Sequence, residues 1–374
     1  MQLSPPSRAL RVVPWLLAAA ALASCSSDPW NDPALGEPFV PAVKTQRRAG
    51  RLFEDANPSI STGAGGASVT MVDRSLWLMG DLSRGLRRNR RIVGPALVST
   101  ARVDWPASDN ADVIPADVPL PVGAYVRWTA GISAGADAAV LHYIAVRPGA
   151  AGEPGLDYLG AGVATLAGDT VSAATDDADW RFFGRGDPAF GLAVVQADHG
   201  VTTGMDYIFG VRGDAGTDRV YLARVPHGRG AERAEYRFLA DDGEWSESVK
   251  DAAPLFRAGP GGMSVSWNDY LGAFLAVYAW VVPGDGKLRP PRLRVMARTA
   301  RHPSGPWGAE TALFEARGVH AGGRVRFGHG AREHRQLARY SGRIIFVSVD
   351  GGPEAGAQQP APPRMWRVEF PEIR

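Results

Sequence analysis

Paired strand segments recur five times along this chain of 374 residues, and this repeat limits the possible folds more than any other feature. Each pair consists of two short apolar segments around a turn. The pairs begin at residues 67, 130, 190, 263 and 336, at intervals of 63, 60, 73 and 73 residues. In the last pair, residues 336–340 are expected to form the first strand and 343–349 the second.

A strand unit of this kind exposes an apolar face until a neighbouring unit covers it, so regular repetition favours radial packing. After residue 25 no stretch keeps a helical apolar period for four turns, and 45 Gly and 29 Pro favour turns over long helices. We therefore predict an all-β fold, a five-bladed β-propeller over residues 56–374. A terminal strand at 365–370 is expected to share a blade with the N-terminal segment. A β-sandwich or two unrelated β domains are the alternatives.

The first 24 residues predict a signal peptide. Arg8 and Arg11 precede a twelve-residue apolar stretch, which is too short to span a membrane. The sequence LASCS then places Cys25, the single cysteine of the chain, where bacterial lipoproteins carry their lipidated cysteine. We expect residues 1–24 to be a lipoprotein signal, and residues 25–55 to be a lipidated cysteine with a flexible tether. The expected location is the cell envelope, at the outer membrane if the host is Gram-negative. An ordinary secretory signal is the alternative.

The charge balance argues against a nucleic-acid partner. Arg8 and Arg11 are the only charged residues before residue 25, so of 41 Lys and Arg, 39 remain in the other 350 residues, against 39 Asp and Glu. Binding to phosphate backbones needs a basic excess that these 350 residues lack. A glycan, and a membrane reached through Cys25, are the expected partners of a monomer.

Several sequence runs resemble the bacterial secreted family called domain of unknown function 4185. The runs are SVTM at 68–71 with LWLMGD at 76–81, FG at 190–191, VYLARVP at 220–226, SVSWNDYLG at 264–272 and SGPW at 304–307. Their order along residues 55 to 370 carries the resemblance. It implies a five-bladed propeller related to arabinanase-like glycosidases, some members resembling endo-D-arabinofuranases.

The resemblance makes Asp81 the first candidate catalytic carboxylate, as base or nucleophile. Glycoside hydrolysis needs a second carboxyl group across the scissile bond. The family's usual second aspartate has no counterpart in residues 63–67, which contain no acid. Asp187 and Glu333 are the candidate substitutes. Capping of a turn by Asp81, and loop salt bridges for the other two, are the structural alternatives.

Four further residues are candidates for substrate binding. Arg84 belongs to an arginine-rich run after Asp81. Trp128 precedes the second strand pair and is expected at the mouth of the propeller's central opening. Phe190 opens the third pair, and His334 follows Glu333. We expect no cofactor and no metal site, because the histidines and the single cysteine lack zinc-ligand spacing. The spacing of His329 and His334 is only weak evidence for a structural cation on the axis.

Two functions follow from these features. The first is a surface-anchored, glycoside hydrolase-like propeller that acts on arabinan-type or related envelope polysaccharide. The second is a non-catalytic glycan-binding or scaffold lipoprotein that has lost one catalytic acid. The sequence leaves open whether the chain is an enzyme.

Overall fold

The structure is a computed structural model of the chain. It describes residues 38–51, 64–70, 74–80, 89–95, 111–113, 116–117, 120–121, 124–134, 138–148, 156–168, 170–175, 179–196, 204–214, 217–259, 262–284, 292–316, 330–349 and 363–372. These residues form β-strands joined by turns and a few single turns of 3-10 helix. In these ranges no helix is long and apolar enough to cross a membrane.

The described strands form five antiparallel sheets, with one short parallel pair, which we number I to V in chain order. Sheet I contains β2 (Ala64–Thr70), β3 (Arg74–Gly80), β4 (Asn89–Pro95) and β5 (Ala111–Val113). Sheet II contains β7 (Tyr125–Ser133), β8 (Ala138–Pro148), β9 (Leu156–Ala167), β10 (Thr170–Ala173) and β6 (Ala116–Asp117). Sheet III contains β11 (Ala189–Val195), β12 (Met205–Asp214), β13 (Thr217–Pro226), β14 (Arg237–Leu239), β15 (Trp245–Ser246) and β16 (Pro254–Arg257).

The last two sheets complete the domain. Sheet IV contains β17 (Met263–Asn268), β18 (Ala273–Val282), β19 (Arg292–Ala300) and β20 (Thr311–Ala316). Sheet V contains β21 (Ala331–Glu333), β22 (Ile344–Val349), β23 (Arg364–Glu369) and β1 (Thr45–Arg51). The last strand of the chain thus pairs with the first described strand, as the sequence predicted for residues 365–370.

Three apolar clusters show that the sheets pack face to face in chain order. One joins Val69 of sheet I to Leu141 and Tyr143 of sheet II. The largest joins sheets II, III and IV, and the third joins sheet IV to sheet V. Second strands such as β8 and β18 are buried along most of their length because a neighbouring sheet covers each of their faces, and their sequences are accordingly almost continuously apolar.

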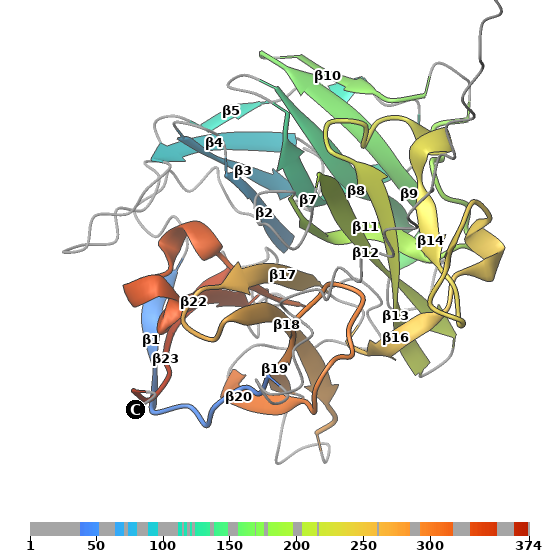
Figure 1. Cartoon of the computed structure of the whole chain (residues 1–374). Helices are drawn as coiled ribbons and strands as arrows, with labels where there is room; N and C mark the ends of the chain where they lie inside the picture. Colours follow the sequence, from blue (N-terminus) through green and yellow to red (C-terminus); the bar gives the residue numbers. More distant parts are fainter. Residues whose placement is uncertain are drawn as a thin grey trace, which may run out of the picture.

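The first strands of the sheets converge on a common centre, which makes the fold an all-β propeller. Strand β7 contacts β2 and β11, and β17 contacts β11 and β21. Figure 1 shows β2, β7, β11 and β17 near the middle of the molecule, with the later strands of each sheet farther out. A hydrogen bond between Ser68 of β2 and His334, directly after β21, connects the last sheet back to the first.

The structure corrects two sequence-based boundaries. Residues 336–340 were expected to form a strand, but the inner strand of sheet V is β21, and two 3-10 turns follow it, η6 (Arg335–Leu337) and η7 (Tyr340–Gly342). The amide of Leu337 bonds to the carbonyl of His334, which curls the chain away from extended geometry. The predicted tether over residues 25–55 includes β1, so the folded domain begins before residue 56.

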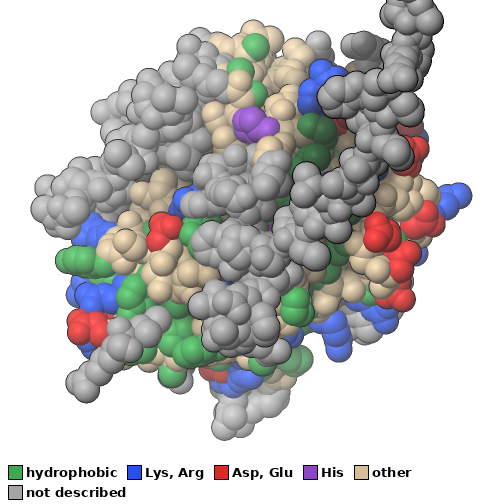
Figure 2. Space-filling model, viewed as in Figure 1, with side chains coloured by type: hydrophobic (Ala, Val, Ile, Leu, Met, Phe, Trp, Pro, Cys, Tyr) green, Lys and Arg blue, Asp and Glu red, His purple; other side chains and the backbone are tan. Residues whose placement is uncertain are grey.

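Strand β1 is an edge strand that carries exposed charge. Arg47 lies opposite Arg367 of β23, and Arg47 and Arg48 are exposed. Figure 2 shows Lys and Arg side chains gathered at the lower left of the molecule, the side on which Figure 1 places β1 and β23. Charged side chains on an edge strand discourage pairing with another chain.

Candidate functional site

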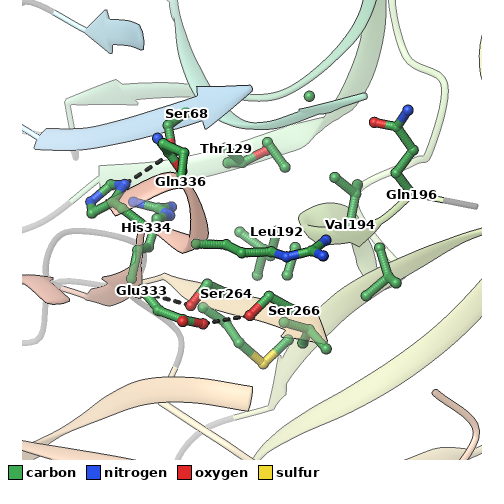
Figure 3. A pocket seen from close by; sticks show the side chains of 18 of the residues that line it. Ser68, Thr129, Leu192, Val194, Gln196, Ser264, Ser266, Glu333, His334 and Gln336 are labelled. Carbon is green, nitrogen blue, oxygen red and sulfur yellow. Dashed lines mark hydrogen bonds between the residues drawn. The ribbon is translucent and has the colours of Figure 1, made fainter. Parts of the chain in front are cut away.

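A cavity of about 140 Å³ lies where the inner strands meet. All five sheets contribute to its wall, either through an inner strand or through the residues directly after it. The lining residues are Ser68 from β2, Thr129 to Gly131 from β7, Leu192 to Gln196 at the end of β11, Met263 to Trp267 from β17, and Arg332 to Gln336 from β21 and η6. Figure 3 shows polar side chains from β2, β17 and the β21–η6 segment pointing toward one another.

Among the described residues that line this cavity, Glu333 is the only one with a carboxyl group. It is only 6% exposed, and it lies at the end of β21. Two serines on one face of β17 hold it: the Ser266 hydroxyl donates to Glu333 Oε2 at 2.5 Å, and the Glu333 amide donates to Ser264 Oγ at 2.7 Å (Figure 3). Because residues i and i+2 of a strand project to the same side, the sequence Ser-Val-Ser places both hydroxyls toward sheet V.

Burial controls the protonation of Glu333. Removal of the carboxylate from water raises its pKa from 4.5 to about 7, although the hydrogen bond from Ser266 and the positive charge of Arg335 oppose the shift. Glu333 therefore carries a proton in a substantial fraction of molecules at neutral pH. A carboxylic acid with such a pKa is able to donate a proton, which an exposed glutamate cannot do efficiently at this pH.

His334 is a buried, neutral histidine that connects two sheets. Its Nδ1 lies 2.9 Å from Ser68 Oγ, and its Nε2 lies 2.7 Å from Ser348 Oγ of β22. Burial, reinforced by the charge of Arg332, lowers its pKa to about 3. One ring nitrogen donates and the other accepts, and the serine hydroxyls rotate to match. His334 is thus a structural crosslink on the cavity wall.

The structure places two other sequence candidates away from the cavity. Trp128, expected at the mouth, is 2% exposed and packs edge-on against Tyr143 in the core between sheets I and II. Phe190 is fully buried and packs against Phe183 and Phe238. Both are corrected to core positions.

Asp187 also lies outside the cavity wall. It precedes β11 and accepts a hydrogen bond from the amide of Gly184 at 2.8 Å, which closes a short turn. This is the local capping role that aspartate commonly plays in turns. Of the predicted site residues, the structure brings Glu333 and His334 together, whereas Asp81, Arg84 and Cys25 lie outside the described residues.

A β-bulge explains the position of Trp128. In β7, Trp128 pairs with Tyr143 and Ala130 with His142, so Thr129 is the extra residue between two successive partners. The bulge turns Thr129 toward the cavity while Trp128 stays in the core. Simple alternation along the sequence gives no sign of such a shift.

Sequence reasoning missed the serines and several polar residues of the wall. Ser264 and Ser266 alternate with buried apolar residues in β17, and this pattern of small hydroxyls on one face is the signal that could have revealed them. Ser68, Arg332 and Gln336 carry no comparable signal, because only the packing of the sheets brings them to one place. Among the described residues, no group of three or more His, Cys, Asp or Glu side chains is arranged to hold a metal ion.

The geometry defines a class of protein, an all-β propeller with a polar cavity on its axis. The profile of the family Domain of unknown function (DUF4185) matches residues 159–350, just over half of the chain. The chain belongs to this family, as the sequence runs indicated. No curated protein sequence matches the chain.

Solved structures with a similar arrangement share little sequence with this chain. The Bombyx mori GH32 β-fructofuranosidase BmSUC1 is 10% identical, with a TM-score of 0.48, over 86% of this chain and 62% of that one. This chain thus spans less than two thirds of that enzyme's length. A glycosyl hydrolase from Bacteroides ovatus is 11% identical over 90% and 97% of the two chains, with a TM-score of 0.46.

A third similar structure is the GH43 endo-arabinanase from Bacillus licheniformis. It is 11% identical, with a TM-score of 0.39, over 83% of this chain and 94% of that one. Likenesses of this size assign no activity to this chain. Its architecture rests on the strand pairing and on the convergence of the inner strands.

Proposed function

We propose that this protein is a five-bladed, carbohydrate-active propeller with a glycoside hydrolase-like site on its axis, acting on arabinan-type or related envelope polysaccharide. The observation that carries the proposal is Glu333, a buried carboxyl group with a raised pKa at the point where all five inner strands meet. Each sheet is taken as one blade, and the pairing of β1 with β23 closes the ring.

Glu333 is assigned the role of general acid. Burial keeps it protonated up to about pH 7, and Ser266 and Ser264 fix its position. The group is therefore suited to protonate the oxygen of a departing sugar. Asp81 is assigned the role of base or nucleophile. It follows Gly80, the last residue of β3, which pairs with Ala64 at the start of the inner strand β2.

One observation favours the second candidate, a glycan-binding lipoprotein without hydrolytic activity. Of the described residues that line the cavity, Glu333 is the only one with a carboxyl group. A single carboxyl group cannot serve as acid and base together. The choice between the two functions therefore depends on Asp81.

We also propose that the protein is exported and works as a monomer on the envelope surface. Residues 1–24 would direct export, and acyl chains on Cys25 would hold the propeller at the membrane, the outer membrane in a Gram-negative host. The support is the position of the single cysteine directly after an apolar stretch that ends in small residues.

The test is release of reducing ends from arabinogalactan by the wild type, Glu333→Gln and Asp81→Asn. We expect the wild type to release oligosaccharides, and each variant to lose about a hundredfold or more of the rate. Glu247→Gln, a glutamate 81% exposed at the surface, is the matched control and should keep full activity. Equal product from the wild type and Glu333→Gln would remove Glu333 from the mechanism.

An aryl glycoside separates the two assigned roles. A nitrophenolate departs without being protonated, so Glu333→Gln should regain much of its rate on that substrate, whereas Asp81→Asn should not. Binding of the polysaccharide by the wild type without any product would identify the second candidate function.

A further inference from the structure

The described part of the chain begins with a segment that runs along the outside of the domain. This segment, residues 38–48, which we call the entry segment, leads into the edge strand β1, and Figure 1 shows it in blue along the lower edge and lower left of the molecule. Pro38 is thirteen positions after Cys25. Even fully extended, thirteen residues span at most about 45 Å, so the entry segment stays close to whatever holds Cys25.

Contacts with sheets IV and V fix the entry segment in place. Val40 is only 6% exposed and belongs to the apolar cluster between these two sheets. The hydroxyl of Thr299 donates to the carbonyl of Pro38 at 2.9 Å, and the amide of Lys44 donates to the carbonyl of Glu369 at 2.9 Å. The side chains that the segment turns outward are therefore held at defined positions on the surface.

One of these outward side chains is a large apolar ring. Phe39 is 68% exposed, the most of the three large apolar side chains that are exposed among the described residues. A single exposed apolar residue is common on protein surfaces and needs no explanation by itself. Phe39 becomes informative because basic side chains follow it within a few residues.

The sequence from residue 38 to residue 51 contains four basic residues and no acidic residue. Lys44 is half-exposed and lies 3.7 Å from Glu369, which Arg367 also binds at 2.7 Å. Arg47 and Arg48 are exposed, and neither forms an ion pair or hydrogen bond with another part of the chain that the structure describes. Their charges are thus available to an anionic surface.

The combination of an exposed aromatic ring with unpaired bases fits the surface of a lipid bilayer. Lipid phosphates attract Lys and Arg side chains, and an aromatic ring beside them enters the boundary between head groups and acyl chains. A soluble polyanion would use the charges and leave the ring in water. Arg47 and Arg48 point to opposite faces of sheet V, but on an edge strand both reach a surface that meets the edge.

We propose that the entry segment docks on a membrane that contains anionic lipids, with Phe39 among the head groups and Lys44, Arg47 and Arg48 facing lipid phosphates. The inference rests on the proposed anchoring at Cys25 and names the surface that the anchored domain contacts. In sheet V, β1 is the outermost strand and β21 the innermost. Docking at this edge therefore leaves the axial cavity on the side of the sheet away from the membrane.

The test measures vesicle binding without the lipid anchor. The full chain carrying Cys25→Ser is sedimented with vesicles of phosphatidylcholine alone, or with vesicles in which about a third of the lipid is phosphatidylglycerol. We expect at least about tenfold stronger binding to the anionic vesicles, and weaker binding as salt increases. The apolar stretch before Cys25 is common to all variants below, so it contributes equally to each comparison.

Substitutions locate the binding in the entry segment. Arg47→Gln with Arg48→Gln should weaken binding to the anionic vesicles by about fivefold for each charge removed. Arg212→Gln with Arg219→Gln is the matched control, because these two exposed arginines lie opposite each other on β12 and β13 of sheet III. This control should bind as its parent does. Equal losses in the two double variants would show general attraction by charge and would overturn the inference.

The aromatic ring is tested separately from the charges. Phe39→Ser should weaken binding to the anionic vesicles by about three- to tenfold, whereas Phe39→Leu, which stays apolar, should keep most of the affinity. All the substituted side chains are exposed, so the variants are expected to fold. Equal binding by Phe39→Ser and its parent would show that the ring does not enter the bilayer and would contradict the proposed docking.

A fluorescent label reports which side of the domain meets the lipid. In the Cys25→Ser background, Ala42→Cys provides a single thiol at an exposed position of the entry segment. A polarity-sensitive dye on this thiol should shift its emission to the blue with anionic vesicles, and a dye on Glu247→Cys, at a side chain 81% exposed after β15, should not. Shifts at both positions or at neither would overturn the inference. Absence of lipid on wild-type Cys25 would remove the anchor and leave these results unchanged, so the two failures are distinguishable.

Discussion

Ser68 Oγ lies 2.9 Å from His334 Nδ1, and this contact joins the first sheet to the last across 266 positions of sequence. The other ring nitrogen bonds to Ser348, so both ring nitrogens of a buried histidine have partners on different strands. Glu333 directly precedes His334, so the contact ties down the backbone next to the carboxyl group, which Ser266 itself holds by a hydrogen bond.

Removal of this contact should destabilise the fold. In Ser68→Ala, His334 keeps its burial but loses a partner for Nδ1, which should cost about 1–3 kcal/mol of unfolding free energy. Denaturant unfolding measures the change as a lower midpoint with an unchanged slope. Ser172→Ala, at an exposed position of β10, should change the free energy by less than about 0.5 kcal/mol. Equal effects of the two variants would contradict the proposed crosslink.

The raised pKa of Glu333 predicts a stability difference that depends on pH. The folded protein holds this proton up to about pH 7, whereas the unfolded chain releases it near pH 4.5. Between these values the folded state binds more protons, so wild-type stability falls as pH rises. Glu333→Gln removes that loss, and its stability relative to the wild type should increase by up to about 3 kcal/mol from pH 4.5 to pH 7. Parallel curves of unfolding free energy against pH would show that Glu333 is not buried as described.

His142 predicts the opposite pH dependence. It is fully buried, neither ring nitrogen has a hydrogen-bond partner among the described residues, and burial lowers its pKa to about 4. The unfolded chain takes up a proton near pH 6.5 and the folded protein does not, so stability is lost as pH falls from 6.5 toward 4. His142→Leu should reduce this loss by up to about 3 kcal/mol, measured by urea unfolding at several pH values. If His142→Leu lost as much unfolding free energy between pH 6.5 and pH 4 as the wild type does, the prediction would be wrong.

Gly191 and Gly168 should respond very differently to substitution by alanine. Gly191 has a φ of +97°, and an added Cβ would lie 2.4 Å from the Cβ of His142. Gly168 has a φ of +56°, and an added Cβ there would have no described atom within 4 Å. We expect Gly191→Ala to cost about 3 kcal/mol or more, and Gly168→Ala about 1 kcal/mol. Thermal and denaturant unfolding of the two variants would show whether the contact with His142 is as close as the structure describes.

Cys25, which lies outside the described residues, carries the prediction about anchoring. Cys25→Ser should abolish incorporation of labelled palmitate in the producing cell and release the protein from the membrane fraction. A second variant that adds Ser27→Cys to Cys25→Ser restores a thiol two positions later. It should remain unlabelled because the new cysteine no longer directly follows the run Leu22-Ala23-Ser24 at the end of the apolar stretch. Labelling of Cys25→Ser, which has no cysteine, would disprove the assignment of Cys25, and labelling of the double variant would show that the position of the cysteine is not fixed.

Local sequence predicted most of the strands but not the inner strand of sheet V. The pairs beginning at 67, 130, 190 and 263 correspond to β2–β3, β7–β8, β11–β12 and β17–β18. In the fifth pair the apolar residues around Leu337 form 3-10 turns instead, because the chain turns after Glu333 to bury His334. Hydrophobic pattern alone does not distinguish a buried turn from a short strand.

The sequence by itself determined the all-β character, the repeated strand pairs and the joining of the last strand to the N-terminal segment, because apolar alternation and turn residues act over a few positions. Only the tertiary structure decided which side chains face the axis. Bulges in β2, β7 and β11 change the direction of the residues after them, so Thr129 reaches the cavity while Trp128 and Phe190 remain in the core. Ser266 and Glu333 are 67 positions apart, and their contact exists because neighbouring sheets pack around one centre, a relation that local pattern cannot encode.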